Sequence, residues 1–200
     1  MEREPEHDGD LDAVLAAAWR LLARGVRDRH APAHTPALAT LTAAGTPTVR
    51  TVVLRGCDPA RRQLVIHTDR RSGKVAEIAA CPAGMVHVYE PARKLQLRLT
   101  CHLQVHMDDA LAGERWAGSR PRSRECYQVT AAPGSALADP AATVFDAAAT
   151  RDGAEHFAVV SARVDALEWL YLAEAGHRRA RFTWHGDEAG AACEATWLVP

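Results

Sequence analysis

The stretch ALATLTAAGTPTVRTVVLRGCD, residues 37–58, decides the fold class of this chain. Two runs rich in threonine, valine and leucine flank the segment AAGTP, whose glycine and proline are typical of a turn. Because side chains alternate between the two faces of a strand, Arg50 shares a face with Val52 and Leu54 in the second run. The stretch therefore predicts two neighbouring strands joined by a tight turn, with a charged residue inside the second strand.

Short segments of the same kind continue towards the C-terminus. The turn DPARR leads to a third strand, and Ser72 then begins a short helix that ends at Cys81-Pro82. Towards the N-terminus, apolar residues recur at helical spacing after Asp10, a residue suited to an N-cap. The pattern predicts strands at 37–42, 48–56, 63–68, 83–90, 94–107, 157–173, 178–186 and 195–200, and helices at 11–26, 72–80, 108–119 and 121–129.

Many antiparallel strands with helices at only a few points predict a mainly β fold with flanking helices, of the α+β class. A small β-barrel and a β-sandwich fit this pattern almost equally well. We expect residues 1–34 to form an acidic N-terminus plus an amphipathic helix, and residues 35–200 to form a single domain. The segment 130–155 is rich in alanine, proline and glycine, and a long connection of this kind often has a function.

The composition excludes several classes of protein. The chain has 200 residues, 48% of them hydrophobic and 24% charged, which is typical of a globular protein. A net charge of −1 gives no general field for nucleic acid, and no apolar run reaches the roughly 20 residues that span a bilayer. The acidic start argues against a signal peptide. We therefore expect a cytoplasmic protein with no nucleic-acid or membrane partner.

Local motifs for metal binding or catalysis are missing from the sequence. The five cysteines are odd in number and widely spaced, and there is neither a CxxC nor an HExxH motif, so we expect reduced cysteines and no metal site. No nucleophile stands beside a base in a recognisable local frame, and no pair of carboxylates suits acid–base catalysis. Any chemistry would therefore come from a bound cofactor.

Clusters of cationic residues point to an anionic ligand. They are Arg50, HTDRRSGK (67–74), SRPRSR (119–124) and HRRAR (177–181). Arg50 has no acidic partner in its own strand, although an edge-strand arginine can also extend to water. Ser72 and Lys74 stand at a helix start, where free N–H groups can receive a phosphate, although a serine there is often only a cap. Each cluster alone can be a solvated charge run, but together they favour a small, multiply anionic ligand such as a phosphorylated cofactor.

The order of these pieces resembles the pyridoxamine 5′-phosphate oxidase family of FMN-binding split β-barrels, in its divergent branch. The resemblance covers residues 35–200, and its most specific part is SRPRS followed by a late RxRF. The matching pieces are ALATLTAAGTPTVRTVVLRGCD, LVIHTDRRSGKVAEI, LQLRLTCHLQV, WAGSRPRS, HRRARF and WLVP. It implies a split barrel that forms a homodimer with FMN at the subunit interface.

The resemblance also implies which residues meet the cofactor. Arg50, Ser72 and Lys74 would bind the phosphate, while Gln96 and Arg181 would reach the flavin bound chiefly by the other subunit. The full cofactor set that it implies is Arg50, Thr51, Val52, Val53, Arg55, His67, Thr68, Ser72, Lys74, Gln96, Trp169, Tyr171 and Arg181.

Three positions near the cofactor depart from the family pattern. Arg55 stands where a lysine near the flavin and the substrate is usual, and arginine cannot donate a proton at neutral pH. His67 replaces a tyrosine, whereas the neighbouring Thr68 matches. Gly73 replaces an arginine, which removes one phosphate contact.

The substrate side departs further from the family. Its implied positions are Arg55, Trp116, Arg120, Arg124, His177 and Arg179. Arg120 matches the arginine that binds the phosphate of the vitamin, but Trp116 replaces a tyrosine and Arg124 a serine. His177 and Arg179 stand in exchanged order.

The resemblance therefore implies an FMN-binding flavoprotein that acts as an oxidoreductase on an unidentified small substrate. Pyridoxamine 5′-phosphate oxidase activity itself is not favoured, because the substrate side is kept less well than the cofactor side. The alternative is a non-catalytic binder or sensor of FMN, haem or pyridoxal phosphate. Whether a deazaflavin replaces FMN stays open, and no catalytic residue is assigned.

Overall fold

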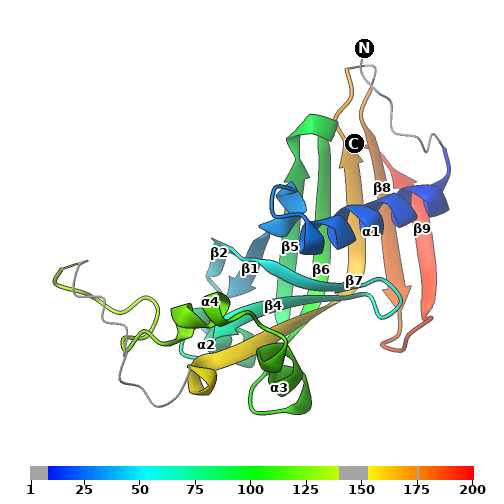
Figure 1. Cartoon of the computed structure of the whole chain (residues 1–200). Helices are drawn as coiled ribbons and strands as arrows, with labels where there is room; N and C mark the ends of the chain where they lie inside the picture. The colour runs from blue at the N-terminus through cyan, green and yellow to red at the C-terminus, as the bar shows by residue number, and fades with distance from the viewer. Residues whose placement is uncertain (1–8, 140–152, 175) are drawn as a thin grey trace.

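The computed structural model describes residues 9–139, 153–174 and 176–200. Within these ranges, nine strands form one antiparallel sheet and four α-helices lie around it (Figure 1). The helices are α1 (Leu11–Arg27), α2 (Gly73–Ala80), α3 (Ala110–Ala117) and α4 (Pro121–Arg124). The strands are β1 (Ala37–Leu41), β2 (Pro47–Thr51), β3 (Leu54–Asp58), β4 (Gln63–Asp69), β5 (Ala83–Glu90), β6 (Leu95–His106), β7 (Phe157–Tyr171), β8 (Arg178–His185) and β9 (Ala192–Leu198).

The long strand β7 divides the sheet into two branches. The strand order is β2-β1-β5-β6-β7-β4-β3, with β8 also paired to β7 and β9 paired to β8. The first half of β7 pairs with β4 from Phe157 to Arg163, and the second half pairs with β8 from Ala166 to Tyr171. In Figure 1, β4 runs sideways below α1, whereas β8 and β9 run upright at the side of the sheet. The predicted mainly β fold with flanking helices is confirmed.

The prediction of one continuous strand over residues 48–56 is wrong. The chain breaks at Val52 and Val53, so β2 pairs with β1 while β3 pairs with β4 in the other branch. The Val52 amide donates a hydrogen bond of 3.0 Å to the Pro36 carbonyl oxygen at this break. The break exists because the first half of this segment pairs in one branch of the sheet and the second half pairs in the other. Local strand propensity gives no information on such pairing.

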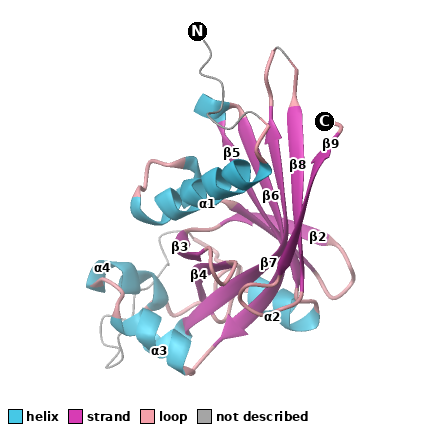
Figure 2. Ribbon diagram, turned by 90° about the vertical axis from the view of Figure 1, so that its right-hand side faces the viewer, coloured by secondary structure: helices cyan, strands magenta, loops and turns pink. Residues whose placement is uncertain are grey.

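The amphipathic helix α1 packs into the core of the sheet. Asp10 caps it as predicted, and its carboxylate accepts hydrogen bonds from the Asp12 and Ala13 amides. Its buried face contributes Ala18 and Leu22 to the main core, against the inward-facing residues of the strands. Figures 1 and 2 show α1 lying across one face of the sheet.

A second, smaller core lies under α3. It contains Val65 of β4, Ala112 of α3, Tyr127, and Phe157 and Val159 of β7. In Figure 2, α3 lies beside the start of β7. Each of the five cysteines is a free thiol. No helix in the described ranges is both long enough and apolar enough to cross a membrane.

Candidate cofactor site

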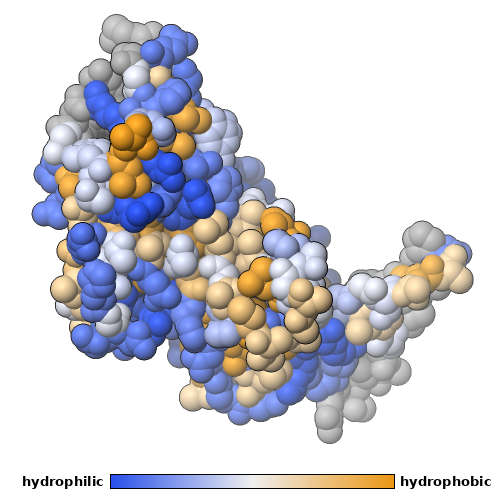
Figure 3. Space-filling view, turned by 180° about the vertical axis from the view of Figure 1, so that it is seen from behind, coloured by the Kyte–Doolittle hydropathy of each residue, from blue (hydrophilic) through white to orange (hydrophobic). Residues whose placement is uncertain are grey.

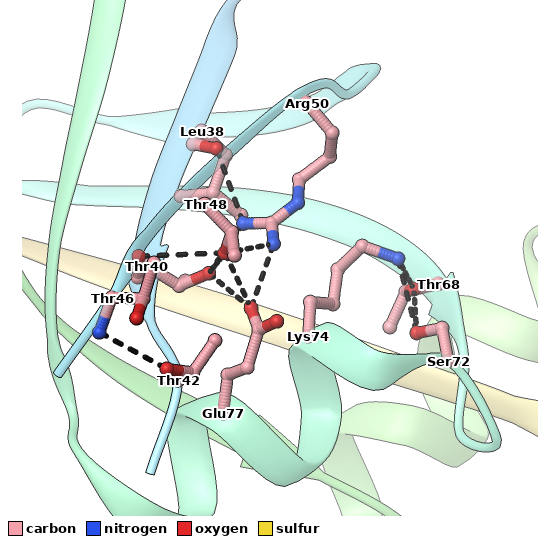
Figure 4. Close-up of polar contacts among 10 residues, drawn as sticks. All are labelled: Leu38, Thr40, Thr42, Thr46, Thr48, Arg50, Thr68, Ser72, Lys74 and Glu77. Atoms are coloured by element: carbon pink, nitrogen blue, oxygen red, sulfur yellow. Dashed lines mark hydrogen bonds and ion pairs between the residues drawn. The ribbon is translucent and has the colours of Figure 1, made fainter. Parts of the chain in front are cut away.

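Arg50 lies on the face of β2 that α2 covers, and Figure 4 shows its guanidinium surrounded by acceptors. One terminal nitrogen donates to the Leu38 carbonyl and the Thr40 hydroxyl, at 3.2 and 2.5 Å. The other donates to the Thr48 hydroxyl and to Oε2 of Glu77, each at 2.7 Å. The acidic partner that its own strand lacks therefore comes from α2, 27 residues further along the chain.

Glu77 is the centre of this cluster. Its Oε2 accepts hydrogen bonds from Thr40, Thr48 and Arg50, and these donors hold the pKa of the carboxyl below its ordinary value, with the Thr40 hydroxyl as the largest cause. The ion pair is partly buried, since the Arg50 and Glu77 side chains are 23% and 17% exposed. Sequence analysis missed Glu77, and its place on the helix that begins at Ser72 was the available signal.

Ser72 and Lys74, which were predicted to bind the phosphate, lie at the start of α2 together with Thr68, which was predicted to lie at the flavin (Figure 4). The Lys74 ammonium donates to the Thr68 hydroxyl at 2.9 Å and to the Ser72 hydroxyl at 3.0 Å. Ser72 is the N-cap residue, but its hydroxyl donates to the Asp69 carbonyl rather than bonding the amides of the helix. Gly73 is open, because an added Cβ would come only within 4.0 Å of Glu77 Oε1.

The charges of this cluster fit an anion. Asp69 is held by Arg71 at 2.7 Å and Glu77 is held by Arg50, while Lys74 has no ion pair within the described part of the chain. Burial, and then the neighbouring Arg50, lower the pKa of Lys74. A phosphate at the start of α2 would relieve this pair of neighbouring cations, so the residues fit an FMN phosphate.

Arg55 and His67 lie on neighbouring strands at the edge of the smaller core. Arg55 is exposed on β3, while the His67 ring packs edge-on against Phe157 with 5.0 Å between the ring centroids. His67 Nε2 is buried and has no hydrogen-bond partner in the described ranges. Burial, followed by the charges of Arg55 and Arg115, lowers the pKa of His67 to about 4, so its imidazole is neutral at pH 7.

Gln96 and Arg181 lie on the opposite face of the sheet from the phosphate cluster. Gln96 alternates with the buried Leu95 and Leu97, and its Oε1 lies 3.1 Å from His87 Nε2. Arg181 donates two hydrogen bonds to Oε1 of Glu168, at 3.0 and 3.1 Å. Within one chain these two residues are therefore not brought to the start of α2.

The remaining cofactor candidates divide between the core and the strand break. Trp169 and Tyr171 belong to the main core, with their ring centroids 6.1 Å apart. Thr51 is exposed on the face of β2 opposite Arg50, and the break itself holds the buried Val52 and the partly buried Val53. The role of these residues towards a flavin stays a prediction.

Several predicted substrate residues are engaged inside the chain. The Arg124 guanidinium carbon lies 4.7 Å from the centroid of the Trp116 ring, and Arg124 donates hydrogen bonds to the carbonyl oxygens of Trp116 and Ala117. These contacts stabilise the turn between α3 and α4. Arg179 donates to Glu168 Oε2 at 2.6 Å. Arg120 and His177 are exposed on the surface.

Glu168 is the second acidic residue that sequence analysis missed. Its carboxylate meets Arg98, Arg179 and Arg181 on the face of the sheet opposite α1, and the alternation of β7 alone gives no sign that three arginines converge there. Figure 3 shows the molecule from behind, where hydrophilic and hydrophobic residues lie side by side.

The fold is that of the split β-barrels. A crystal structure of a pyridoxamine 5′-phosphate oxidase-related, FMN-binding protein from Nostoc punctiforme superposes with a TM-score of 0.76. The two chains are 20% identical, and the match covers 92% of this chain and 96% of the other. PhzG from Burkholderia lata, in complex with tetrahydrophenazine-1-carboxylic acid, gives a TM-score of 0.72 at 20% identity, over 99% of this chain and 98% of PhzG. At these identities the likeness establishes the fold.

The sequence comparison adds a match to one family over part of the chain. Residues 16–107 match the family described as pyridoxamine 5′-phosphate oxidase, FMN-binding domain. No relative was found among curated proteins. Over these residues the chain is similar to the pyridoxamine 5′-phosphate oxidase-like family.

Proposed function

We propose that this chain is a homodimeric flavoprotein that binds FMN through the start of α2 and acts as an oxidoreductase on a small molecule in the cytoplasm. The observation that carries the proposal is the Lys74 ammonium, held by two hydroxyls beside Arg50 and without a carboxylate partner in the described chain. A phosphate monoester carries a charge of about −1.5 to −2 at pH 7, which this arrangement can receive.

The chain's own contribution is to bind and orient. Bound FMN supplies a flavin ring that accepts a hydride, which no side chain of the cluster can do. Arg50 keeps a fixed direction because four of its N–H groups are engaged by Leu38, Thr40, Thr48 and Glu77. At the position of Arg55 a guanidinium contributes charge rather than acid–base catalysis.

The two faces of the sheet support the proposed dimer. Arg50 is on the face that α2 covers, whereas Gln96 and Arg181 are on the opposite face. One flavin can contact both sets if one set comes from a second copy of the chain. Exposed apolar side chains on this opposite face, Val49 at 67% and Tyr89 at 43%, support an interface there.

A comparison of two flavins tests the phosphate assignment. FMN and riboflavin share the ring but differ in the phosphate, so fluorescence titration with both isolates the phosphate contribution. We expect Lys74→Ala and Arg50→Ala each to weaken FMN binding roughly 10- to 100-fold, the worth of one charge-assisted hydrogen bond, and to leave riboflavin binding unchanged. Arg93→Ala, at an exposed site between β5 and β6, is the matched control. Wild-type FMN affinity in both variants would refute the assignment.

A non-catalytic binder or sensor is the second candidate. It is favoured by the engagement of Arg124 on Trp116 and of Arg179 on Glu168, which leaves fewer groups for a substrate. Purified protein that bleaches with dithionite and regains its colour in air would show a redox-active flavin. Turnover with a supplied donor would then separate an oxidoreductase from a sensor.

A further inference from the structure

A cavity of about 340 Å³ lies between the start of α1, the turn between β3 and β4, and the loop between β8 and β9. Helix α1 contacts both β3 and β9, and Figure 1 shows its start beside β8 and β9, away from α2. The cavity shares no lining residue with the phosphate cluster at the start of α2. Cavities that hold small ligands have volumes of roughly 300–1,000 Å³, so this one has room for a small molecule.

A buried cation forms part of the cavity wall. Arg62 lines the cavity, although only 4% of this residue is exposed. Its two terminal nitrogens donate to the carbonyl oxygens of Val164, Gly186 and Glu188, at distances of 2.9 to 3.3 Å. Its Nε has no hydrogen-bond partner, and Arg62 makes no ion pair with any residue that the structure describes. Because a charge removed from water is costly without a counter-charge, Arg62 favours an anionic group beside it.

The backbone also fixes Arg62 at this place. Its φ of 52° is in the left-handed region, which is uncommon for an arginine. Its amide donates to the Pro59 carbonyl at 3.2 Å, and its carbonyl accepts a hydrogen bond of 2.8 Å from the Val164 amide. Residues that the surrounding structure holds in this conformation cluster at ligand-binding sites. The backbone of the turn therefore agrees with the unpaired charge in pointing to a ligand.

Two tryptophans form an apolar surface beside this cation. Trp19 of α1 and Trp184 of β8 line the cavity, with their ring centroids 6.4 Å apart. The Arg62 guanidinium carbon lies 5.7 Å from the centroid of the Trp184 ring, so the cation and the apolar surface adjoin. Asp12 also lines the cavity, but it is exposed, and water screens an exposed charge more than a buried one. The cavity therefore combines a buried positive charge with an apolar wall.

We propose that this cavity binds a small monocarboxylate, with its carboxylate at Arg62 and its apolar body against Trp19 and Trp184. A guanidinium holds a carboxylate more strongly than a neutral acceptor, because the charges strengthen the hydrogen bond, and Nε of Arg62 is the donor left for it. A phosphate monoester carries a charge of about −1.5 to −2, which one guanidinium does not neutralise, so a monocarboxylate fits better. The site is separate from the proposed flavin site.

Tryptophan fluorescence follows binding directly, because Trp19 and Trp184 line the cavity. The full-length protein is titrated with hexanoate, hexanamide, hexylammonium and acetate. Hexanamide keeps the apolar body of hexanoate without its charge, whereas acetate keeps the charge without the body. We expect hexanoate to bind most tightly, hexanamide and acetate to bind more weakly by roughly tenfold or more, and hexylammonium not to bind.

Four variants locate the bound carboxylate. Arg62→Met should weaken hexanoate binding roughly 10- to 100-fold, and its folding is checked by circular dichroism because Arg62 also bonds three carbonyl oxygens. Ala16→Phe fills the cavity from an exposed position of α1 and should abolish hexanoate binding. Asp12→Asn removes the exposed carboxylate and should tighten hexanoate binding slightly. Ala79→Phe, at an exposed position of α2, is the matched control for Ala16→Phe.

Titrations with FMN present separate this cavity from the flavin site. We expect hexanoate to bind equally well to the FMN-loaded protein and to Lys74→Ala, because the cavity contains no residue of the phosphate cluster. Equal binding of hexanoate and hexanamide, or wild-type hexanoate affinity in Ala16→Phe or in folded Arg62→Met, would overturn the proposal. Displacement of hexanoate by FMN, or loss of hexanoate binding in Lys74→Ala, would also overturn it, because the anion would then lie at the start of α2.

Discussion

Replacing Glu77 with glutamine tests whether the Arg50 cluster is held by charge. Glu77→Gln keeps the shape of the side chain but removes its charge, and it leaves the Arg50 guanidinium without a counter-charge in the described chain. Exposed ion pairs contribute about 0–1 kcal/mol, whereas breaking a buried pair costs about 3–5 kcal/mol. Because these side chains are 23% and 17% exposed, we expect an intermediate loss of about 2 kcal/mol in the free energy of unfolding.

The pH dependence of this loss has a definite sign. The folded state lowers the pKa of Glu77 below its ordinary 4.5, so the carboxylate contributes its full stability above pH 4.5. That contribution disappears as the pH falls through the folded pKa, because the carboxyl then takes up a proton. The unfolding curves of the wild type and of Glu77→Gln should therefore differ most near neutral pH and converge in acid.

Urea denaturation of four proteins measures the effect: the wild type, Arg50→Met, Glu77→Gln and the double variant. A coupling energy of about 2 kcal/mol is expected from this cycle. Glu114→Gln, at an exposed site on α3, controls for the loss of a surface carboxylate. Additive single effects, or a gap between wild type and Glu77→Gln that persists unchanged to low pH, would refute the reasoning.

Three further outcomes are expected. Light scattering of the FMN-loaded protein should give twice the 21.7 kDa chain mass, and a monomer with FMN fully bound would contradict the dimer. The holoprotein should oxidise pyridoxamine 5′-phosphate with a kcat/KM far below the ordinary range of about 10⁴–10⁸ M⁻¹s⁻¹, measured as pyridoxal 5′-phosphate formed in aerated buffer. Trp116 lacks the hydroxyl of a tyrosine, and a value inside that range would show that the substitution is tolerated. His67 binds a proton less readily when folded, at a pKa of about 4 against 6.5, so stability should fall as the pH drops from 6.5 towards 4. His67→Gln should remove this fall, and an unchanged acid limb would show that other groups cause it.

Local patterns in the sequence predicted most of the elements. Alternation and turn residues located the strands, and β5 occupies the predicted range 83–90. Asp10 and Ser72 marked the starts of two helices because N-cap positions have a local chemical signature. The residues gathered at the start of α2 were also predictable, since Thr68, Ser72 and Lys74 lie within seven positions of one another.

The prediction of a split β-barrel rather than a β-sandwich depended on the family resemblance. Hydrophobic alternation is the same in both architectures, because each buries one face of an antiparallel sheet. Hydrophobic alternation also does not predict the break at Val52 and Val53, because the break depends on which strand each half of the segment pairs with.

Only the tertiary structure decided which charges meet. Arg50 has no acidic neighbour in its own strand, but α2 packs against β2 and places Glu77 within ion-pair distance of Arg50. Likewise, the pairing of β6, β7 and β8 places three arginines around Glu168. Coulomb interactions and hydrogen bonds act over a few ångströms of space, whatever the separation along the chain. The sequence by itself therefore determined most of the elements and the residues at the start of α2, whereas register and packing decided which of the cationic residues already have a partner.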